Sequence, residues 1–149
     1  MNVPLTEPLR ERLLAAAREA AGHAYCPYSQ FHVGAALLIR EEIITGCNVE
    51  NASYGLTICA ERVAVFRAVA SGLSGPIEAV ALCCRDAPAT AAAEGRMPCG
   101  ACRQVLAEFA SADLPVLIDG VGEMTLRDLL PRPFMLHRDS LHDRQTSSS

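Results

Sequence analysis

The chain has 149 residues, of which 50% are hydrophobic and 20% are charged, and its formal net charge is −4. This length suits one domain with a single sizeable core, and this composition argues against intrinsic disorder. An acidic balance without a cluster of Lys and Arg argues against a nucleic-acid-binding protein, so we expect a small-molecule partner.

The N-terminal residues, the lengths of the apolar runs and the cysteine content indicate the cellular compartment. Residues 1–11 hold no apolar stretch of signal-peptide type, and no apolar run is long enough to span a bilayer. With seven cysteines and no export signal, free thiols or metal ligands are expected rather than a disulfide framework. We therefore expect a cytoplasmic protein without a membrane partner.

The first half of the chain predicts one helix and a pair of strands. A helix is expected over 6–23, because Thr6 can cap it and Pro8 stands in its first turn. Two strands are expected over 32–39 and 42–49. The charged turn between them is typical of a hairpin.

The second half alternates helices with strands. The expected segments are a helix over 59–71, a strand over 77–84, a loop over 86–97, a helix over 99–110, a strand over 115–119 and a helical turn over 125–130. Strands that alternate with helices predict an α/β sandwich with a mixed sheet, and the order from Glu42 onward favours parallel pairing there. We expect one domain over 1–136 and a flexible tail over 137–149.

Three cysteines form the most informative pattern. Cys59 begins one expected helix, whereas Cys99 and Cys102 lie three residues apart at the start of another and so face the same side. A helix start favours a thiolate, because its N–H groups are unpaired and the helix dipole is positive there. A structural zinc site takes four protein ligands, whereas a catalytic site takes three and leaves one position open. The sequence therefore predicts a catalytic zinc held by these three thiols.

One carboxylate and two arginines accompany the cysteines. Glu61 lies two residues after Cys59, a spacing that diverges within a helix, so it is badly placed as a fourth ligand. With Cys59 at the cap position, Glu61 can instead border the open metal position and move protons. Three thiolates leave a zinc cluster with excess negative charge. Arg62 and Arg103 can each donate to a ligand sulfur and offset that charge.

Two other interpretations of the cysteines stay open. A Cys-x-x-Cys pair at a helix start, here Cys99 and Cys102, is also typical of a dithiol redox site. A zinc ion held by these thiols could instead be purely structural, as in an interaction domain. The third cysteine, which Ala60-Glu61-Arg62 follows, favours the catalytic metal site over both.

With these residues the chain resembles the homotetrameric class of zinc-dependent cytidine deaminases, from about Leu9 to Phe134. The matching segments are Tyr25-Cys26-Pro27-Tyr28-Ser29, residues 31–38, residues 48–54, Cys59-Ala60-Glu61-Arg62 and residues 98–105. The last two are widely shared among zinc deaminases, whereas the first three are more specific for nucleoside binding. The resemblance implies a three-layer α/β/α sandwich with a mixed sheet of about five strands. It also implies one Zn²⁺ per subunit and hydrolytic deamination of cytidine and 2′-deoxycytidine in pyrimidine salvage, with Glu61 as the catalytic base and acid.

The resemblance implies substrate contacts as well. Asn48 and Glu50 are alternate residues at a strand end, so their side chains project the same way and suit a pair of ribose hydroxyls. By resemblance these two bind the sugar. Phe31 would line the pocket near the base, and Ala60 would offer backbone groups to the pyrimidine edge.

In the tetramer that the resemblance implies, residues from other subunits complete each pocket. Ala52 and Tyr54 would reach into a neighbour's site, and Phe134 would cover a neighbour's base. A single chain of this length has few residues with which to enclose a nucleoside. This is compatible with pockets that neighbouring subunits complete.

The chain departs from the family pattern in three places. His32 and Met97 stand where relatives usually carry Pro or a small residue, and the loop over 86–97 is long. Neither residue is expected to touch the metal. Whether this long loop restricts entry to the pocket is a question for the structure.

The nearest alternative is a deaminase of another cytosine nucleoside. Blasticidin S deaminases share the Cys-Ala-Glu and Pro-Cys-Gly-x-Cys segments with this chain. The stretches 31–38 and 48–54, together with Phe134, favour the ordinary nucleoside.

Overall fold

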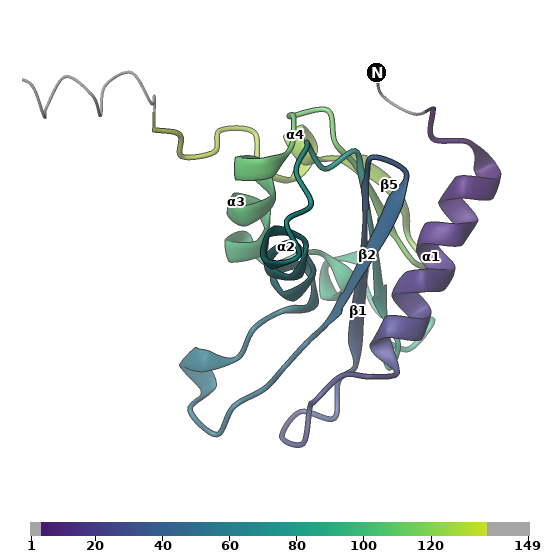
Figure 1. Ribbon diagram of the computed structural model, residues 1–149. Coiled ribbons are helices and arrows are strands. Elements are labelled where there is room, and N and C mark those ends of the chain that lie inside the picture. The colour runs from purple at the N-terminus through teal and green to yellow at the C-terminus, as the bar shows by residue number, and fades with distance from the viewer. Residues whose placement is uncertain (1–3, 137–149) are drawn as a thin grey trace, which may run out of the picture.

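The computed structural model describes residues 4–136, and a five-stranded sheet lies between two layers of helices (Figure 1). The strands are β1 (Val33–Ile39), β2 (Glu42–Cys47), β3 (Ala79–Cys84), β4 (Pro115–Ile118) and β5 (Gly122–Thr125). The helices are α1 (Glu7–Ala21), α2 (Ala60–Ala70), α3 (Gly100–Phe109) and α4 (Leu126–Leu129), with short 3-10 helices at Tyr54–Leu56 and Ala93–Arg96. The tail predicted at 137–149 lies outside the described residues. Within 4–136, no helix combines the length and apolarity needed to cross a membrane.

The strand order is β2-β1-β3-β4-β5, which makes the sheet mixed. The predicted hairpin is confirmed, because β1 and β2 pair antiparallel around Arg40 and Glu41. Parallel pairing from Glu42 onward is right only for β3 and β4. It is wrong for β2, since β1 lies between β2 and β3 and pairs antiparallel with both. The prediction also lacked β5, whose residues are exposed or half-buried and show no strand-like apolar pattern.

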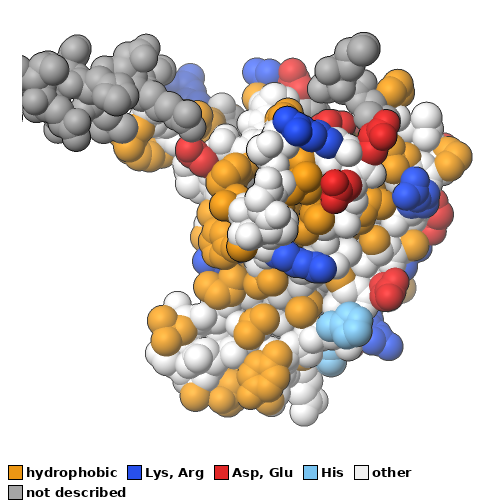
Figure 2. Space-filling model, viewed as in Figure 1, with side chains coloured by type: hydrophobic (Ala, Val, Ile, Leu, Met, Phe, Trp, Pro, Cys, Tyr) orange, Lys and Arg blue, Asp and Glu red, His pale blue; other side chains and the backbone are white. Residues whose placement is uncertain are grey.

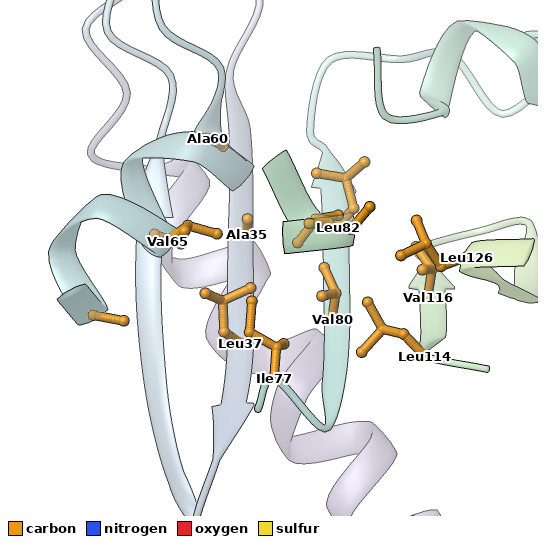
Figure 3. Packing of buried hydrophobic residues seen from close by; sticks show 14 of the residues in the cluster. Ala35, Leu37, Ala60, Val65, Ile77, Val80, Leu82, Leu114, Val116 and Leu126 are labelled. Atoms are coloured by element: carbon orange, nitrogen blue, oxygen red, sulfur yellow. The ribbon is translucent and has the colours of Figure 1, made fainter. Parts of the chain in front are cut away.

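Each face of the sheet carries its own core, which confirms the predicted three layers. On one face α1 packs on alternate residues of β1 and β3. That cluster contains Leu13, Ala17, Ala36, Leu38, Ala79, Ala81, Cys83 and Leu117. On the other face α2 and α3 cover the remaining alternate residues, among them Leu37, Val80 and Leu82 (Figure 3). This second face carries the starts of α2 and α3, and therefore the three cysteines.

Gly34 in β1 allows α1 to approach the sheet closely. A Cβ at this position would lie 1.9 Å from the Ala17 oxygen and 2.4 Å from the Ala21 nitrogen, both of them backbone atoms of α1. We expect Gly34→Ala to lower the free energy of unfolding by about 3 kcal/mol, because the helix must shift off its core. Urea unfolding measures this. Gly55→Ala is the control, since a Cβ there meets nothing within 4 Å, and equal stability of the two variants would contradict the argument.

One ion pair ties α1 to the end of β4. Arg18 donates from Nε to Asp119 Oδ2 at 2.9 Å and from Nη2 to Oδ1 at 2.7 Å. These hydrogen bonds hold the pKa of Asp119 below its ordinary value. Because the folded pKa is the lower one, the pair stabilises the fold above the unfolded pKa of about 4. That stability is lost as the pH falls through the folded pKa.

Asp119→Asn should therefore lower the free energy of unfolding by about 1 kcal/mol at neutral pH, a value limited by the partial exposure of both partners. Below about pH 4 the difference from the wild type should shrink, since the wild-type carboxylate is then protonated too. Urea titrations at pH 7 and pH 3 measure this difference. Asp113→Asn, which breaks the exposed pair with Arg127, is the control. A penalty for Asp119→Asn that is independent of pH would contradict the linkage.

Candidate active site

The three predicted cysteines come together where α2 and α3 begin. Cys59 is the N-cap residue of α2, Cys99 is that of α3, and Cys102 is buried in the first turn of α3. The Cys59 and Cys99 sulfurs are 3.7 Å apart, and those of Cys99 and Cys102 are 3.5 Å apart. Tetrahedral zinc with Zn–S bonds of about 2.3 Å would hold its sulfurs about 3.8 Å apart. The donor set therefore fits a tetrahedral metal with one open position.

No other group of three or more His, Cys, Asp or Glu side chains in the described part of the chain is arranged to hold a metal. All seven cysteines are free thiols. A redox pair of Cys99 and Cys102 alone would not require the third sulfur at the same point. The clustering of all three therefore favours a metal site.

Arg62 supports the thiolate at Cys59. Its Nη2 lies 3.5 Å from the Cys59 sulfur, as predicted from the spacing of three residues. The Cys102 thiol and the Arg62 guanidinium together hold the pKa of Cys59 well below its ordinary value. A thiolate is the form that zinc binds, so this environment prepares a ligand.

Arg103 has a different role from the one expected. Its Nε donates to the Pro98 carbonyl at 2.8 Å and its Nη1 to the Leu129 carbonyl at 2.7 Å. Among residues 4–136 it has no hydrogen bond to a ligand sulfur, so that prediction is wrong. The guanidinium points from α3 toward the end of α4. It thereby fixes the Pro98 backbone just before Cys99, and so orients a ligand without touching it.

Glu61 lies in the first turn of α2, only 4% exposed, and lines the same cavity as Cys59 and Cys99. Burial raises the pKa of its carboxyl to about 7. A carboxyl that titrates near neutrality can both accept and return a proton. A divalent cation bound beside it would favour its charged form and lower that pKa. The side chain is thus a buried acid–base group beside three thiols.

The cavity in front of the cysteines has a volume of about 440 Å³, within the range of small-molecule sites. Seven of the predicted site residues line it, namely Phe31, Asn48, Glu50, Cys59, Ala60, Glu61 and Cys99. Its other lining residues are Ser29, Val33, Thr57, Leu82, Cys84, Gly95 and Met97. The sequence therefore predicted half of this wall, and the missing half comes from segments without a chemical motif.

Glu50 is fixed in the wall by the loop before β1. Its carboxylate accepts hydrogen bonds from the Tyr28 nitrogen at 3.0 Å, the Ser29 nitrogen at 3.2 Å and the Ser29 hydroxyl. The Ser29 hydroxyl is the main cause of the lowered pKa of Glu50. The side chain therefore stays ionised and offers acceptor oxygens to the cavity.

Asn48 is 8% exposed and already has a protein partner at each end of its amide. Its Oδ1 accepts from the Val33 nitrogen at 2.9 Å, and its Nδ2 donates to the Phe31 carbonyl at 2.8 Å. The amide therefore anchors the segment that carries Phe31, a structural role that residue types alone did not indicate. One N–H and one lone pair remain for a ligand.

Ala52, Tyr54 and Phe134 do not line this cavity. Tyr54 is 74% exposed and Phe134 is 70% exposed. The backbone of Phe134 is held by Gln104, which donates to the Phe134 oxygen at 2.8 Å and accepts from its nitrogen at 3.1 Å. In the single chain these three residues therefore lie outside the cavity wall.

Comparisons with known proteins agree with this site. Residues 8–118 match the family model described as the cytidine and deoxycytidylate deaminase zinc-binding region. A cytidine deaminase of Sporosarcina psychrophila is 44% identical over 130 residues, which cover 83% of this chain and 90% of that protein. One from Mycobacterium tuberculosis is 49% identical over 122 residues, with coverage of 80% and 85%. The crystal structure of cytidine deaminase from Mycobacterium tuberculosis superposes with a TM-score of 0.72 at 43% identity, covering 85% of this chain and 97% of that one.

Proposed function

The chain belongs to the family of cytidine and deoxycytidylate deaminases, and from this premise we propose that it hydrolyses cytidine and 2′-deoxycytidine to the corresponding uridines. Ammonia is the second product. The observation that carries the proposal is the buried Glu61 beside three converging thiols, at the wall of a cavity of about 440 Å³. The close relatives named cytidine deaminase support the same substrate.

Cys59, Cys99 and Cys102 would hold Zn²⁺, which when bound supplies a Lewis acid that activates water at neutral pH. Glu61 takes a proton from the water that attacks C4 of the ring and delivers it to N3. Glu61 then takes the second proton from the new hydroxyl at C4 and gives it to the departing amino group, so that ammonia leaves and a C4 carbonyl remains. Burial of Glu61 at the cavity wall suits both transfers, because the carboxyl is shielded from bulk water and lies beside the three thiols.

The polar wall would orient the nucleoside. Glu50 stays ionised and Asn48 has one free N–H, so together they suit a pair of ribose hydroxyls. The Phe31 ring would lie against the base, and the Ala60 backbone would meet the pyrimidine edge. All four residues line the same cavity as Glu61, which supports this arrangement.

The direct test follows the ultraviolet change as purified, zinc-loaded protein converts cytidine into uridine. We expect turnover that a strong chelator abolishes and that added zinc restores. Folded, zinc-loaded protein without turnover of cytidine would contradict the proposal. Turnover of blasticidin S in its place would establish the nearest alternative.

We also propose that the chain acts as a homotetramer in which Ala52, Tyr54 and Phe134 complete the cavity of a neighbour. Large apolar side chains lie exposed in the single chain, among them Tyr54, Leu56, Phe66, Val69 and Phe134. Figure 2 shows hydrophobic side chains gathered on the lobe that carries the 3-10 helix at Tyr54–Leu56. Such patches mark association surfaces. Sedimentation equilibrium measures the mass, and a fully active monomer would contradict shared sites.

We further propose that the protein is cytoplasmic and acts in pyrimidine salvage. Seven free cysteines suit a reducing compartment. The net charge of −4 supports a free nucleoside rather than a nucleic acid as partner. Activity confined to the cytosolic fraction of its cell would test the location.

A further inference from the structure

The long loop over 86–97 is held by polar contacts at both ends. At its start, the Asp86 carboxylate accepts from the His32 backbone nitrogen at 2.6 Å and lies 2.8 Å from the His32 Nδ1. At its end, Arg96 donates from Nη2 to the Pro88 carbonyl at 2.6 Å and from Nη1 to the Asp119 carbonyl at 3.3 Å. Arg96 therefore joins the two ends of the loop to each other and to the end of β4.

Apolar packing holds this loop only at its C-terminal end, where the half-buried Met97 packs against the core that α2 and α3 cover. None of the residues from 86 to 97 is buried. A segment without buried side chains opens at low cost, unless hydrogen bonds hold it. Hydrogen bonds from a charged donor are stronger than those between neutral groups, so Arg96 is the main polar anchor at this end.

Gly120, in the turn that follows β4, leaves room for this contact. A Cβ at Gly120 would lie 2.3 Å from Nη1 of Arg96, so a larger residue there would displace the guanidinium. Both acceptors of Arg96 are backbone carbonyls, and none of the ion pairs within residues 4–136 includes Arg96. The guanidinium is thus committed to the shape of the backbone rather than to a carboxylate.

The same loop forms part of the substrate cavity. Gly95 and Met97, which flank Arg96 in sequence, both line the cavity. The Cys84 thiol lies 3.9 Å from the Arg96 carbonyl and lines the cavity as well. The side chain of Arg96 thus points toward the loop and β4, while its two neighbours face the substrate space.

We propose that Arg96 is a positioning residue for substrate binding, whose guanidinium pins the 86–97 loop so that Gly95 and Met97 close one wall of the cavity. This inference rests on the proposed function. We call the hydrogen bonds of Arg96 to the Pro88 and Asp119 carbonyls the clamp. Loss of the clamp would let this wall of the cavity move and would weaken nucleoside binding. The proton transfers at Glu61 would be unaffected, because Arg96 touches neither Glu61 nor a zinc ligand.

The test compares Arg96→Ala with Arg12→Ala, which removes an exposed arginine from α1, both in the zinc-loaded full chain. For Arg96→Ala we expect KM for cytidine to rise about tenfold while kcat stays within about twofold. The control should keep both constants. Arg96→Lys should recover part of the loss, since one ammonium can still reach the Pro88 carbonyl. If Arg96 had only a structural role, Arg96→Ala would have a lower melting temperature. Its KM, measured well below that melting temperature, would then equal the wild-type value.

Met97→Ala provides a second test that leaves the clamp in place. It opens the same wall directly, so it should also raise KM, and its effect should not add fully to that of Arg96→Ala. Full additivity, or an unchanged KM in folded Arg96→Ala, would overturn the inference. If Arg96→Ala fails to fold, Arg96→Lys and Met97→Ala decide in the same way.

Amide hydrogen exchange separates this inference from the proposed function. Exchange within 86–97 should become faster in Arg96→Ala whatever the substrate, and unchanged exchange would contradict the clamp. Wild-type protein that fails to deaminate cytidine would contradict the proposed function instead. The two failures are therefore distinguishable.

Discussion

Glu61→Gln is expected to lower kcat for cytidine by about a hundredfold to ten-thousandfold while zinc stays bound. Glutamine fills the same buried volume, so the wall of the cavity is preserved. It cannot accept a proton from water or return one to the amino group. Glu61→Ala should abolish turnover as well, with an added void in the first turn of α2. The ultraviolet assay gives kcat, and elemental analysis gives the zinc content.

Glu108→Gln is the matched control, because Glu108 is an exposed carboxylate on α3. Its kcat should equal that of the wild type. Glu61→Gln that keeps more than about a tenth of the wild-type kcat would refute the role of Glu61 as proton carrier. Loss of zinc from Glu61→Gln would show that the carboxylate ligates the metal, against the divergent spacing of Glu61 and Cys59.

The metal cluster was predictable from sequence because its geometry is local. Two cysteines three residues apart on a helix must face the same side, and a cysteine just before a helix becomes its cap. The only long-range condition is that α2 and α3 start at the same point. The alternation of strands and helices makes that condition plausible, and in the structure the sulfurs of Cys59 and Cys99 are 3.7 Å apart.

Features that depend on long-range packing could not be predicted from the sequence. Spacing alone assigned Arg103 to a sulfur, but its guanidinium donates to the nearby Pro98 carbonyl and to the Leu129 carbonyl at the end of α4, and the second contact depends on tertiary packing. The insertion of β1 between β2 and β3 cannot be derived from the order of elements along the chain. Gly95 and Met97 face the cavity because an exposed loop is clamped there, and no periodic pattern encodes such a contact.

The second large effect concerns the metal. Cys102→Ala should reduce the zinc content from about one ion per chain to a small fraction of that, because two thiolates cannot complete the site. Turnover of cytidine should fall to the background. Cys102 is the right residue to change, since it is buried and lies within 3.5 Å of Cys99. Cys47→Ala is the control, because Cys47 is a half-buried thiol outside the cluster.

The same variant tests whether zinc also holds the fold together. One metal bound to Cys59 and Cys99 joins the starts of α2 and α3, so its loss should lower the melting temperature. Chelation of zinc from the wild type should lower the melting temperature to the same extent as Cys102→Ala, and chelator should then have no further effect on the variant. Cys102→Ala that retains a full equivalent of zinc would contradict the ligand assignment. Equal melting temperatures with and without zinc would instead mean that the sheet and its two cores hold α2 and α3 in place before the metal binds.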